Sequence, residues 1–271
     1  MHGGVRLQFW VGLVIVMTIV VVAIFANQLS PHGYAEQALT KALLPPFWME
    51  RGESAYLLGT DRLGRDLLSR LMVGARVSTA VGLFSVLLGG SIGIIAGLVA
   101  GFYGSWVDRV LSRLIDIQLS FPPVFLAIAI LAAMGQNLFN MILVLGLVTW
   151  VQYARVSRGS TLSLRHQEFI VAAEAIGARQ DRILLRHLLP SVLPPLAVIA
   201  TVNMSSMILA EAALSFLGLG VQPPTPAWGS MVSEARAVQS IAWWNAVFPG
   251  MAIALFVTGA NLMGEGLRRR T

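Results

Sequence analysis

Residues 77–102 read VSTAVGLFSVLLGGSIGIIAGLVAGF, an apolar run long enough to cross a bilayer about 30 Å thick as a helix. Gly89, Gly93, Gly97 and Gly101 recur at intervals of four residues within it, so they share one side of that helix. Glycines leave a smooth ridge against which the backbone of a second membrane helix can pack closely. The stretch therefore predicts a transmembrane helix at a close helix–helix contact.

The rest of the chain has the same apolar character. Of its 271 residues, 56% are hydrophobic and only 12% are charged, about half the charged fraction of a soluble domain. Five further apolar runs are long enough to be spans, and Pro122 and Pro123 are expected to kink or interrupt one of them. These runs cover residues 9–29, 114–134, 138–153, 191–216 and 244–263. We predict an all-α polytopic membrane protein with six transmembrane helices.

The first run could also be a cleaved signal peptide, because Arg6 precedes it and Ala23 and Ala26 lie near its end. Its 21 apolar residues exceed the usual core of a signal peptide, so we favour an uncleaved anchor. We expect residues 1–75 to hold this anchor and an extracytoplasmic segment. Residues 76–271 would then form a core of five spans.

Residues 59–78, GTDRLGRDLLSRLMVGARVS, predict an amphipathic helix that begins at a cap on Thr60 or Asp61. Such a helix is expected to lie in the membrane interface, packed either on lipid or on its own protein. Two ion pairs at i,i+4 spacing are expected along its polar face, joining Arg62, Asp66 and Arg70. Its apolar face would be made of Leu63, Leu67, Leu68, Leu71 and Met72.

The distribution of basic residues predicts the topology. Six spans put both termini on one side, and that side then carries twelve of the nineteen Lys and Arg residues. The excess predicts cytoplasmic termini and a cytoplasmic loop at 155–190. A polar turn is expected at 103–113 on the same side, and an outward loop at 218–243. The net charge of +6 is explained by these loops, so it does not indicate nucleic-acid binding.

Sequence features of enzymes are missing. The only lysine is Lys41, followed by Ala42, so no phosphate-binding loop ending in Lys-Ser or Lys-Thr exists. There is no cysteine and no HExxH pattern. The triplet Gly89-x-Ser91-x-Gly93 matches a serine-hydrolase elbow, but no histidine lies in a span to serve as its base. We therefore expect no catalytic or metal site on this chain.

Two carboxylates, Asp116 and Glu211, fall in or near predicted spans. Intramembrane carboxylates are costly and indicate a functional site by default, here a lining of a translocation pathway. Each could equally form a structural bond to a neighbouring helix. A proton- or ion-coupled standalone carrier would use such residues, although the sequence has no inverted repeat of interrupted helices.

Residues 167–190, QEFIVAAEAIGARQDRILLRHLLP, form a polar island between apolar runs. A short helix is expected from Gln167 to Ile176, with Phe169, Ala173 and Ile176 on one face and Gly177 as its left-handed stop. A second helix, capped by Asp181, is expected over 182–189, ending before Pro190. The island could dock in another protein's groove or pack on its own bundle.

The island resembles the cytoplasmic coupling loop of ABC importer permeases, E-A-A-x-x-x-G followed by I-x-x-x-x-L-P. Val171 occupies the place of the motif's first glutamate, and neither Glu168 nor Glu174 is in register with it. The resemblance implies a contact with an ATP-binding subunit. The residues expected at that contact are Glu168, Phe169, Ala172, Ala173, Glu174, Gly177, Arg182 and Pro190.

Three more stretches, at 58–78, 214–231 and 248–268, are similar to signatures of the dipeptide, oligopeptide and nickel permeases, and specifically to the second, dipeptide-permease-C-like subunit. Ala227 and Glu265 depart from residues usual in that family. The resemblance implies the type I importer permease fold in a bacterial inner membrane.

The resemblance also implies the partners: a second permease subunit, two cytoplasmic ATP-binding subunits that carry ATP and Mg²⁺, and an extracytoplasmic binding protein. No cofactor is implied on this chain. Di- or oligopeptides are the first choice of substrate, and nickel or another small solute is the alternative.

Overall fold

A computed structural model describes residues 2–268 of the chain. Nearly all of the ordered structure is helical, and five helices are long and apolar enough to cross a membrane. A sixth span is obtained if the bent pair α4 (Ser105–Leu119) and α5 (Pro123–Met134) counts as one. The long helices are α1 (His2–Ile24), α3 (Leu67–Tyr103), α6 (Leu138–Leu164), α9 (Leu189–Phe216) and α11 (Trp244–Arg268).

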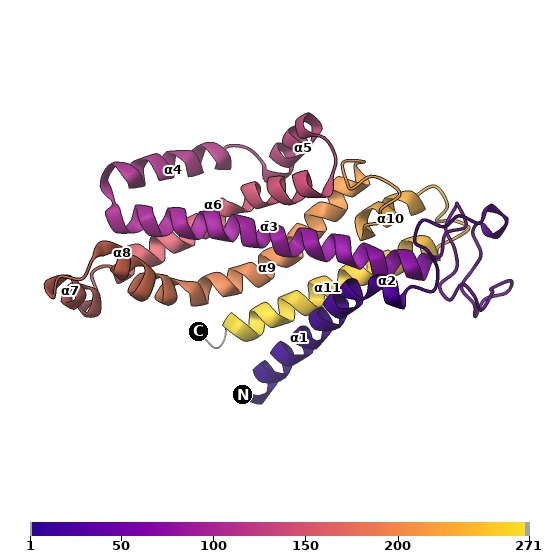
Figure 1. The fold of residues 1–271 in the computed structure, drawn as a ribbon, viewed down its shortest axis with the longest axis horizontal. Helices are drawn as coiled ribbons and strands as arrows, with labels where there is room; N and C mark the ends of the chain where they lie inside the picture. The colour runs from indigo at the N-terminus through magenta and orange to yellow at the C-terminus, as the bar shows by residue number, and fades with distance from the viewer. Residues whose placement is uncertain (1, 269–271) are drawn as a thin grey trace.

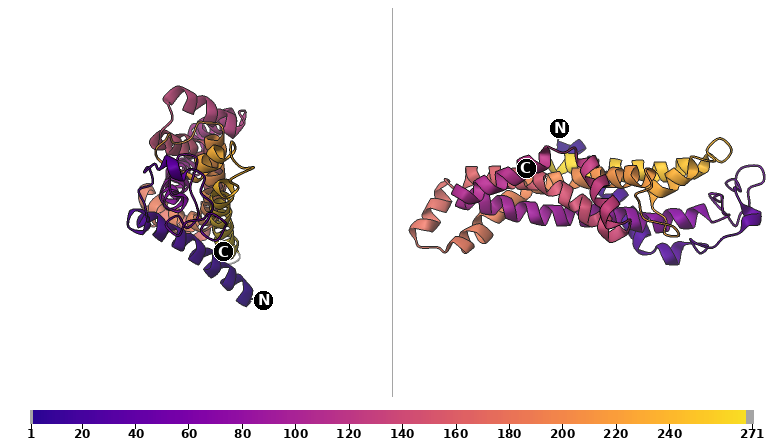
Figure 2. Two further views of the ribbon diagram at one scale, coloured as in Figure 1. Left: turned by 90° about the vertical axis from the view of Figure 1, so that its right-hand side faces the viewer. Right: turned by 90° about the horizontal axis from the view of Figure 1, so that it is seen from above.

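The long helices run side by side in an elongated bundle (Figures 1 and 2). α3 lies at its centre and packs most extensively on α6, while α1 packs on α11 and α11 on α9. At one end of the bundle lie the irregular residues 30–66, which include a 3₁₀ turn, Leu39–Lys41, and an isolated β-bridge between Thr60 and Asp66. At the other end lie the short helices α7 (Glu168–Ala175) and α8 (Gln180–Ile183).

The glycine ridge of α3 meets α6, as the sequence predicts. A Cβ atom at Gly93 would lie 2.3 Å from the carbonyl oxygen of Trp150, and one at Gly97 would lie 2.4 Å from that of Ala154. Real Cβ atoms do not come this close, so only glycine permits the contact. The ridge thus fixes the central helix pair of the bundle.

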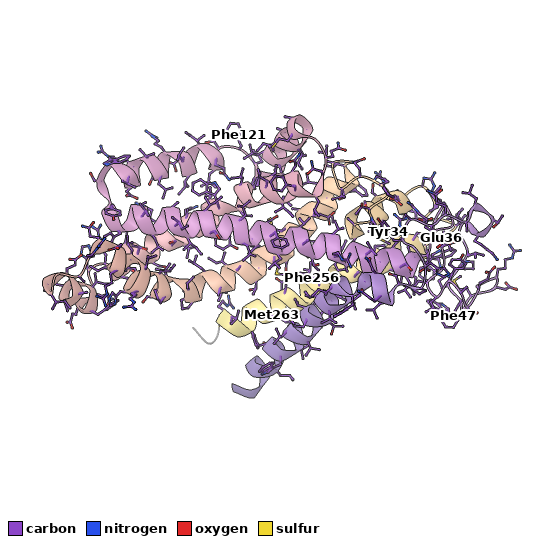
Figure 3. All side chains as sticks on the ribbon, viewed as in Figure 1. Tyr34, Glu36, Phe47, Phe121, Phe256 and Met263 are labelled. Carbon is purple, nitrogen blue, oxygen red and sulfur yellow. The ribbon has the colours of Figure 1, made fainter. Side chains whose placement is uncertain are left out.

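The predicted break at Pro122 and Pro123 is confirmed and is larger than a kink. α4 (Ser105–Leu119) and α5 (Pro123–Met134) meet at 86°. Figure 3 shows Phe121 at this break. The expected polar turn at 103–113 is wrong, because α4 starts directly after Gly104, whose positive φ of 62° reverses the chain.

The separate amphipathic helix at 59–78 is also wrong. The helix begins at Leu67, where the Asp66 carboxylate accepts the backbone N–H of Ser69 at 2.8 Å, and it continues without a break into the span. Arg70 is only 2% exposed, so this part of α3 is a buried element. The expected division at residues 75 and 76 falls inside the same helix.

The expected pairs among Arg62, Asp66 and Arg70 do not form; the ion pairs near the start of α3 are an i,i+4 pair, Asp61 with Arg65, and pairs with residues further along the chain. Asp61 accepts from Arg65 at 2.6 Å and also pairs with Arg70. Glu234, on α10 (Trp228–Ala235), accepts from Arg65 and from Arg70, both at 2.9 Å. We call Asp61, Arg65, Arg70 and Glu234 the charge cluster. It ties the irregular segment to α3 and α10.

Three further boundaries differ from expectation. α6 continues from the predicted end at Tyr153 to Leu164, and the expected loop at 218–243 contains α10. The second island helix does not end before Pro190, because α8 passes through a π-helical turn, Leu184–Leu188, directly into α9. Pro190 has no N–H to bond to the carbonyl four residues earlier, which favours a wider turn at this junction.

Candidate functional site

The island's first helix, α7, protrudes at one end of the bundle (Figure 1). Gly177 ends it with φ of +78°, as the sequence predicts, and its N–H donates to the carbonyl of Glu174 at 2.9 Å. The N–H of Ala178 donates to the carbonyl of Ala173 at 3.0 Å, which closes the helix end. Glu168 stands in the first turn, where the helix dipole favours a negative charge.

One side of α7 packs on its own protein. Ile170 is fully buried and Ala173 is 7% exposed, and both belong to a hydrophobic cluster with Ile183 and Leu188. Ala173 was expected on one face with Phe169 and Ile176, but it is buried and so does not contribute to their exposed surface. Ala173 instead holds α7 against the start of the α8–α9 segment.

The other side of α7 is uncovered. Phe169 is 43% exposed and Ile176 is 85% exposed, and Ala172, also exposed, lies between them. Their spacing of three and four residues places them on one stripe, which we call the outer stripe. The apolar surface of the stripe ends in Ile176. The sequence predicts Ile176 on one face of the first island helix, but it is not one of the residues expected to contact an ATP-binding subunit. Its position at i+7 from Phe169 is the signal that identifies it.

Exposed charged residues neighbour the outer stripe in the chain. Glu174 and Arg182 are exposed, and Arg179 pairs with Asp181 at 3.2 Å on the surface. Pro190 is exposed in the first turn of α9. Of the expected contact residues, the structure therefore gathers Glu168, Phe169, Ala172, Glu174 and Gly177 on the exposed part of α7, while Arg182 and Pro190 lie beyond it.

Glu211 lies deep in the bundle. It is fully buried, and its carboxylate accepts from the hydroxyls of Ser215 at 2.7 Å and of Ser78 at 3.1 Å. The Ser78 hydroxyl in turn accepts the N–H of Trp228 at 3.2 Å. Glu211 therefore joins α9 to α3 and, through Ser78, to α10.

Asp116 is exposed on α4, and among residues 2–268 its side chain forms no ion pair or hydrogen bond with Glu211. The two carboxylates thus do not make a common site. Ser91 lies inside the continuous helix α3, which offers no strand-to-helix elbow to a hydrolase nucleophile.

Comparison with known proteins decides the family. Residues 93–271 match the binding-protein-dependent transport system inner membrane component family. The chain belongs to this family. Residues 9–46 match a second family, described as the N-terminal TM domain of oligopeptide transport permease C, which supports an N-terminal membrane helix.

The curated relatives of this inner-membrane component cover nearly its whole length. It is 44% identical over 257 residues to the di/tripeptide transport system permease protein DppC of Pseudomonas aeruginosa, covering 95% of this chain and 85% of the relative. It is also 44% identical over 254 residues to the glutathione transport system permease protein GsiD of Escherichia coli, covering 93% and 82%.

The fold is likewise that of an importer. A chain of the inward-facing MetNI methionine ABC transporter matches with a TM-score of 0.61 at 20% identity, over 74% of this chain and 96% of that chain. The protein is thus a multi-pass permease subunit of an ABC importer, a class in which an ATP-binding subunit works with the membrane subunit.

Proposed function

We propose that this chain forms half of the translocation pathway for di- and oligopeptides and couples it to ATP hydrolysis through the outer stripe of α7. A second permease subunit would form the other half. Two cytoplasmic ATP-binding subunits would hold ATP and Mg²⁺, and an extracytoplasmic binding protein would deliver the peptide. This chain would carry no cofactor and no catalytic residue.

The exposure of Ile176 carries the coupling proposal. An isoleucine that is 85% exposed, in line with Phe169, leaves apolar surface in water unless a partner covers it. The buried side of α7 is held by Ile170 and Ala173, so a force on the outer stripe is transmitted to the α8–α9 segment and to the span that continues from it. That path converts movement of a partner into movement of a membrane helix.

The names of the relatives support the peptide substrate, because one is a di/tripeptide permease and another transports glutathione, itself a tripeptide. The excess of basic residues, twelve to seven, supports cytoplasmic termini and a cytoplasmic α7. The same architecture carrying nickel or another small solute remains the alternative substrate class.

The test is a single charge in the outer stripe. Ile176→Glu is expected to abolish co-purification of the ATP-binding subunits, and ATP-driven uptake of a dipeptide into proteoliposomes, because it buries an unpaired carboxylate in the contact. Leu39→Glu is the matched control, since Leu39 is 69% exposed in the irregular segment at the opposite end of the molecule. Retention of both co-purification and uptake by Ile176→Glu would overturn the coupling role.

Two further outcomes concern the substrate and the class. ATP-driven uptake of a nickel chelate, with no uptake of peptides, would replace the peptide assignment and leave the coupling intact. Uptake by this chain alone in liposomes, driven by a proton gradient without ATP, would instead support a standalone carrier.

A further inference from the structure

A cavity of about 690 Å³ opens between α6, α9 and the end of α4. Its volume lies in the range of pockets that hold small molecules, about 300–1,000 Å³. Val198 and Val202 line its α9 side, near the middle of the apolar segment Gln180–Phe216. Polar side chains lie among these apolar ones: Gln152 and Arg155 on α6 and Asn203 on α9.

Arg155 is the unusual member of this lining. It is exposed in a membrane helix, and among the described residues no carboxylate pairs with it. Arg158, three residues further along α6, does have such a partner, because its guanidinium binds the Asp108 carboxylate with two hydrogen bonds. Arg158 therefore ties α6 to α4, whereas Arg155 keeps its charge available at the cavity.

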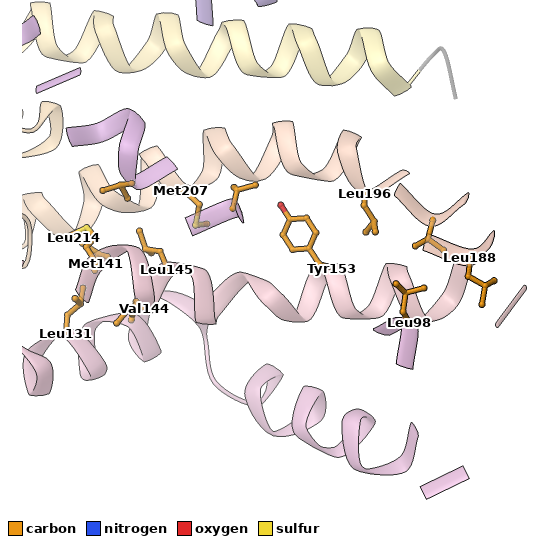
Figure 4. Close-up of a cluster of buried hydrophobic side chains, with 14 of the residues drawn as sticks. Leu98, Leu131, Met141, Val144, Leu145, Tyr153, Leu188, Leu196, Met207 and Leu214 are labelled. Atoms are coloured by element: carbon orange, nitrogen blue, oxygen red, sulfur yellow. The ribbon is translucent and has the colours of Figure 1, made fainter. Parts of the chain in front are cut away.

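Asn203 gives a second, independent indication of a ligand. Asn203 is only 5% exposed, yet its side-chain Nδ2 has no hydrogen-bond partner in the described structure. The buried hydroxyl of Tyr153, which reaches from α6 toward α9 (Figure 4), lies beside the Asn203 side chain but makes no hydrogen bond of normal geometry. Unpaired buried polar groups cost free energy, and a bound polar solute or water relieves that cost.

None of the residues lining the cavity is acidic, so its fixed charge is the single positive charge of Arg155. Its polar groups can donate hydrogen bonds to a carboxylate and to amide carbonyls. We propose that this cavity is the part of the peptide pathway contributed by this chain, and that Arg155, with Gln152 and Asn203, binds the C-terminal carboxylate of the passing peptide. The inference rests on the proposed peptide function.

The first arm of the test measures whether the cavity holds water and a positive charge. The chain has no cysteine, so Val202→Cys provides a single thiol in the lining, in an assembly whose other subunits carry no reactive thiol. An anionic methanethiosulfonate reagent is expected to modify it faster than a cationic one, and Arg155→Gln is expected to remove that preference. The control is Ile95→Cys, in the wholly apolar lining of a groove between α3 and α4, which should react with neither.

The second arm compares a tripeptide that has a free carboxylate with its C-terminal amide. Arg155→Gln should lower uptake of the free acid about tenfold, since a charge-assisted hydrogen bond is lost. Uptake of the amide should change little, and Arg155→Lys should retain most of the free-acid uptake. For each peptide, the uptake by the variant is divided by the uptake by the wild type. This ratio cancels any preference of the binding protein for the free acid or the amide. Arg113→Gln, an exposed arginine on α4, is the matched charge control.

The outcomes separate this inference from the function on which it rests. If the assembly imports peptides but the Val202→Cys thiol is unreactive, the cavity is covered by a partner helix or lipid and the inference fails alone. Equal effects of Arg155→Gln on the two peptides also overturn it. If the wild-type assembly imports no peptide, the proposed function fails, whatever the thiol reactivity.

Discussion

The two ends of the bundle are built in opposite ways. At the end near α10, charged side chains are enclosed: Arg70 is 2% exposed and Asp61 is 5% exposed, and they meet Glu234 from a distant part of the chain. At the α7 end, apolar side chains are uncovered, and Ile176 is 85% exposed. The first end pairs its buried charges within the subunit, while the second leaves the apolar surface of α7 for a partner.

The polarity of a segment therefore does not predict whether that segment lies on the surface of the molecule. Residues 59–70 are rich in charge but are largely internal, whereas six of the eight residues of α7 are apolar and yet the helix projects outward. Burial follows from the available partners. A guanidinium can be buried when carboxylates meet it, and an isoleucine stays exposed when its helix has already used its other side for packing.

The largest expected effect comes from breaking the enclosed end. Arg70→Met should lower the free energy of unfolding by about 3–5 kcal/mol, because the buried Asp61 carboxylate loses one of its two guanidinium partners. Unfolding in mixed micelles with a rising fraction of denaturing detergent measures this. Arg62→Met, at an exposed neighbouring position, is the control and should be near neutral. Equal losses at the two positions would contradict an enclosed cluster.

A pair of isoleucines on one short segment sharpens the comparison at the other end. Ile170→Ala should lower the free energy of unfolding by about 3 kcal/mol, since Ile170 is fully buried and leaves a cavity. Ile176→Ala should change it by no more than about 0.5 kcal/mol, because that side chain is already exposed. The same unfolding assay applies to both. A large loss at Ile176 in the isolated subunit would mean that the outer stripe packs on its own chain.

The smallest effect is expected where the enclosed end meets solvent. The Glu234 side chain is 33% exposed, so Glu234→Gln should cost about 1–2 kcal/mol through its weakened bonds to Arg65 and Arg70. Raising the salt concentration to about 0.5 M should reduce this cost by screening, while the cost of Arg70→Met should persist. Unfolding of both variants at low and high salt makes the comparison. If salt reduced the destabilisation equally in the two variants, Arg70 would be as accessible to solvent as Glu234.

Local sequence signals predicted several features correctly. Five of the six spans, the glycine contact, the break at the proline pair and the stop at Gly177 follow from hydropathy, steric size and backbone preference, which act over a few residues. The predictions were wrong where a contact with a residue distant in the sequence determines the local structure. Asp61 was expected to cap a helix, but the helix begins at Leu67 and Asp61 pairs with Arg65 and Arg70. Ala173 was expected on one face with Phe169 and Ile176, but it is buried with residues of the α8–α9 segment.

The cavity was beyond sequence reasoning for the same reason. Arg155 and Arg158 are three residues apart and chemically identical, so no local pattern separates the paired arginine from the free one. Their difference comes from Asp108, which lies fifty positions earlier and is brought to α6 by α4. Asp116 and Glu211 were the pathway residues expected from sequence, but neither lines the cavity.

The sequence by itself therefore determined that this chain is a multi-span helical membrane protein, and its motifs pointed to the family. Hydrophobic length and glycine spacing suffice for this, because the bilayer and the helix impose their periods on each segment separately. Only the tertiary structure decided which side of α7 is free, which arginines are neutralised and where a polar cavity opens. Those properties depend on contacts between segments far apart in the chain.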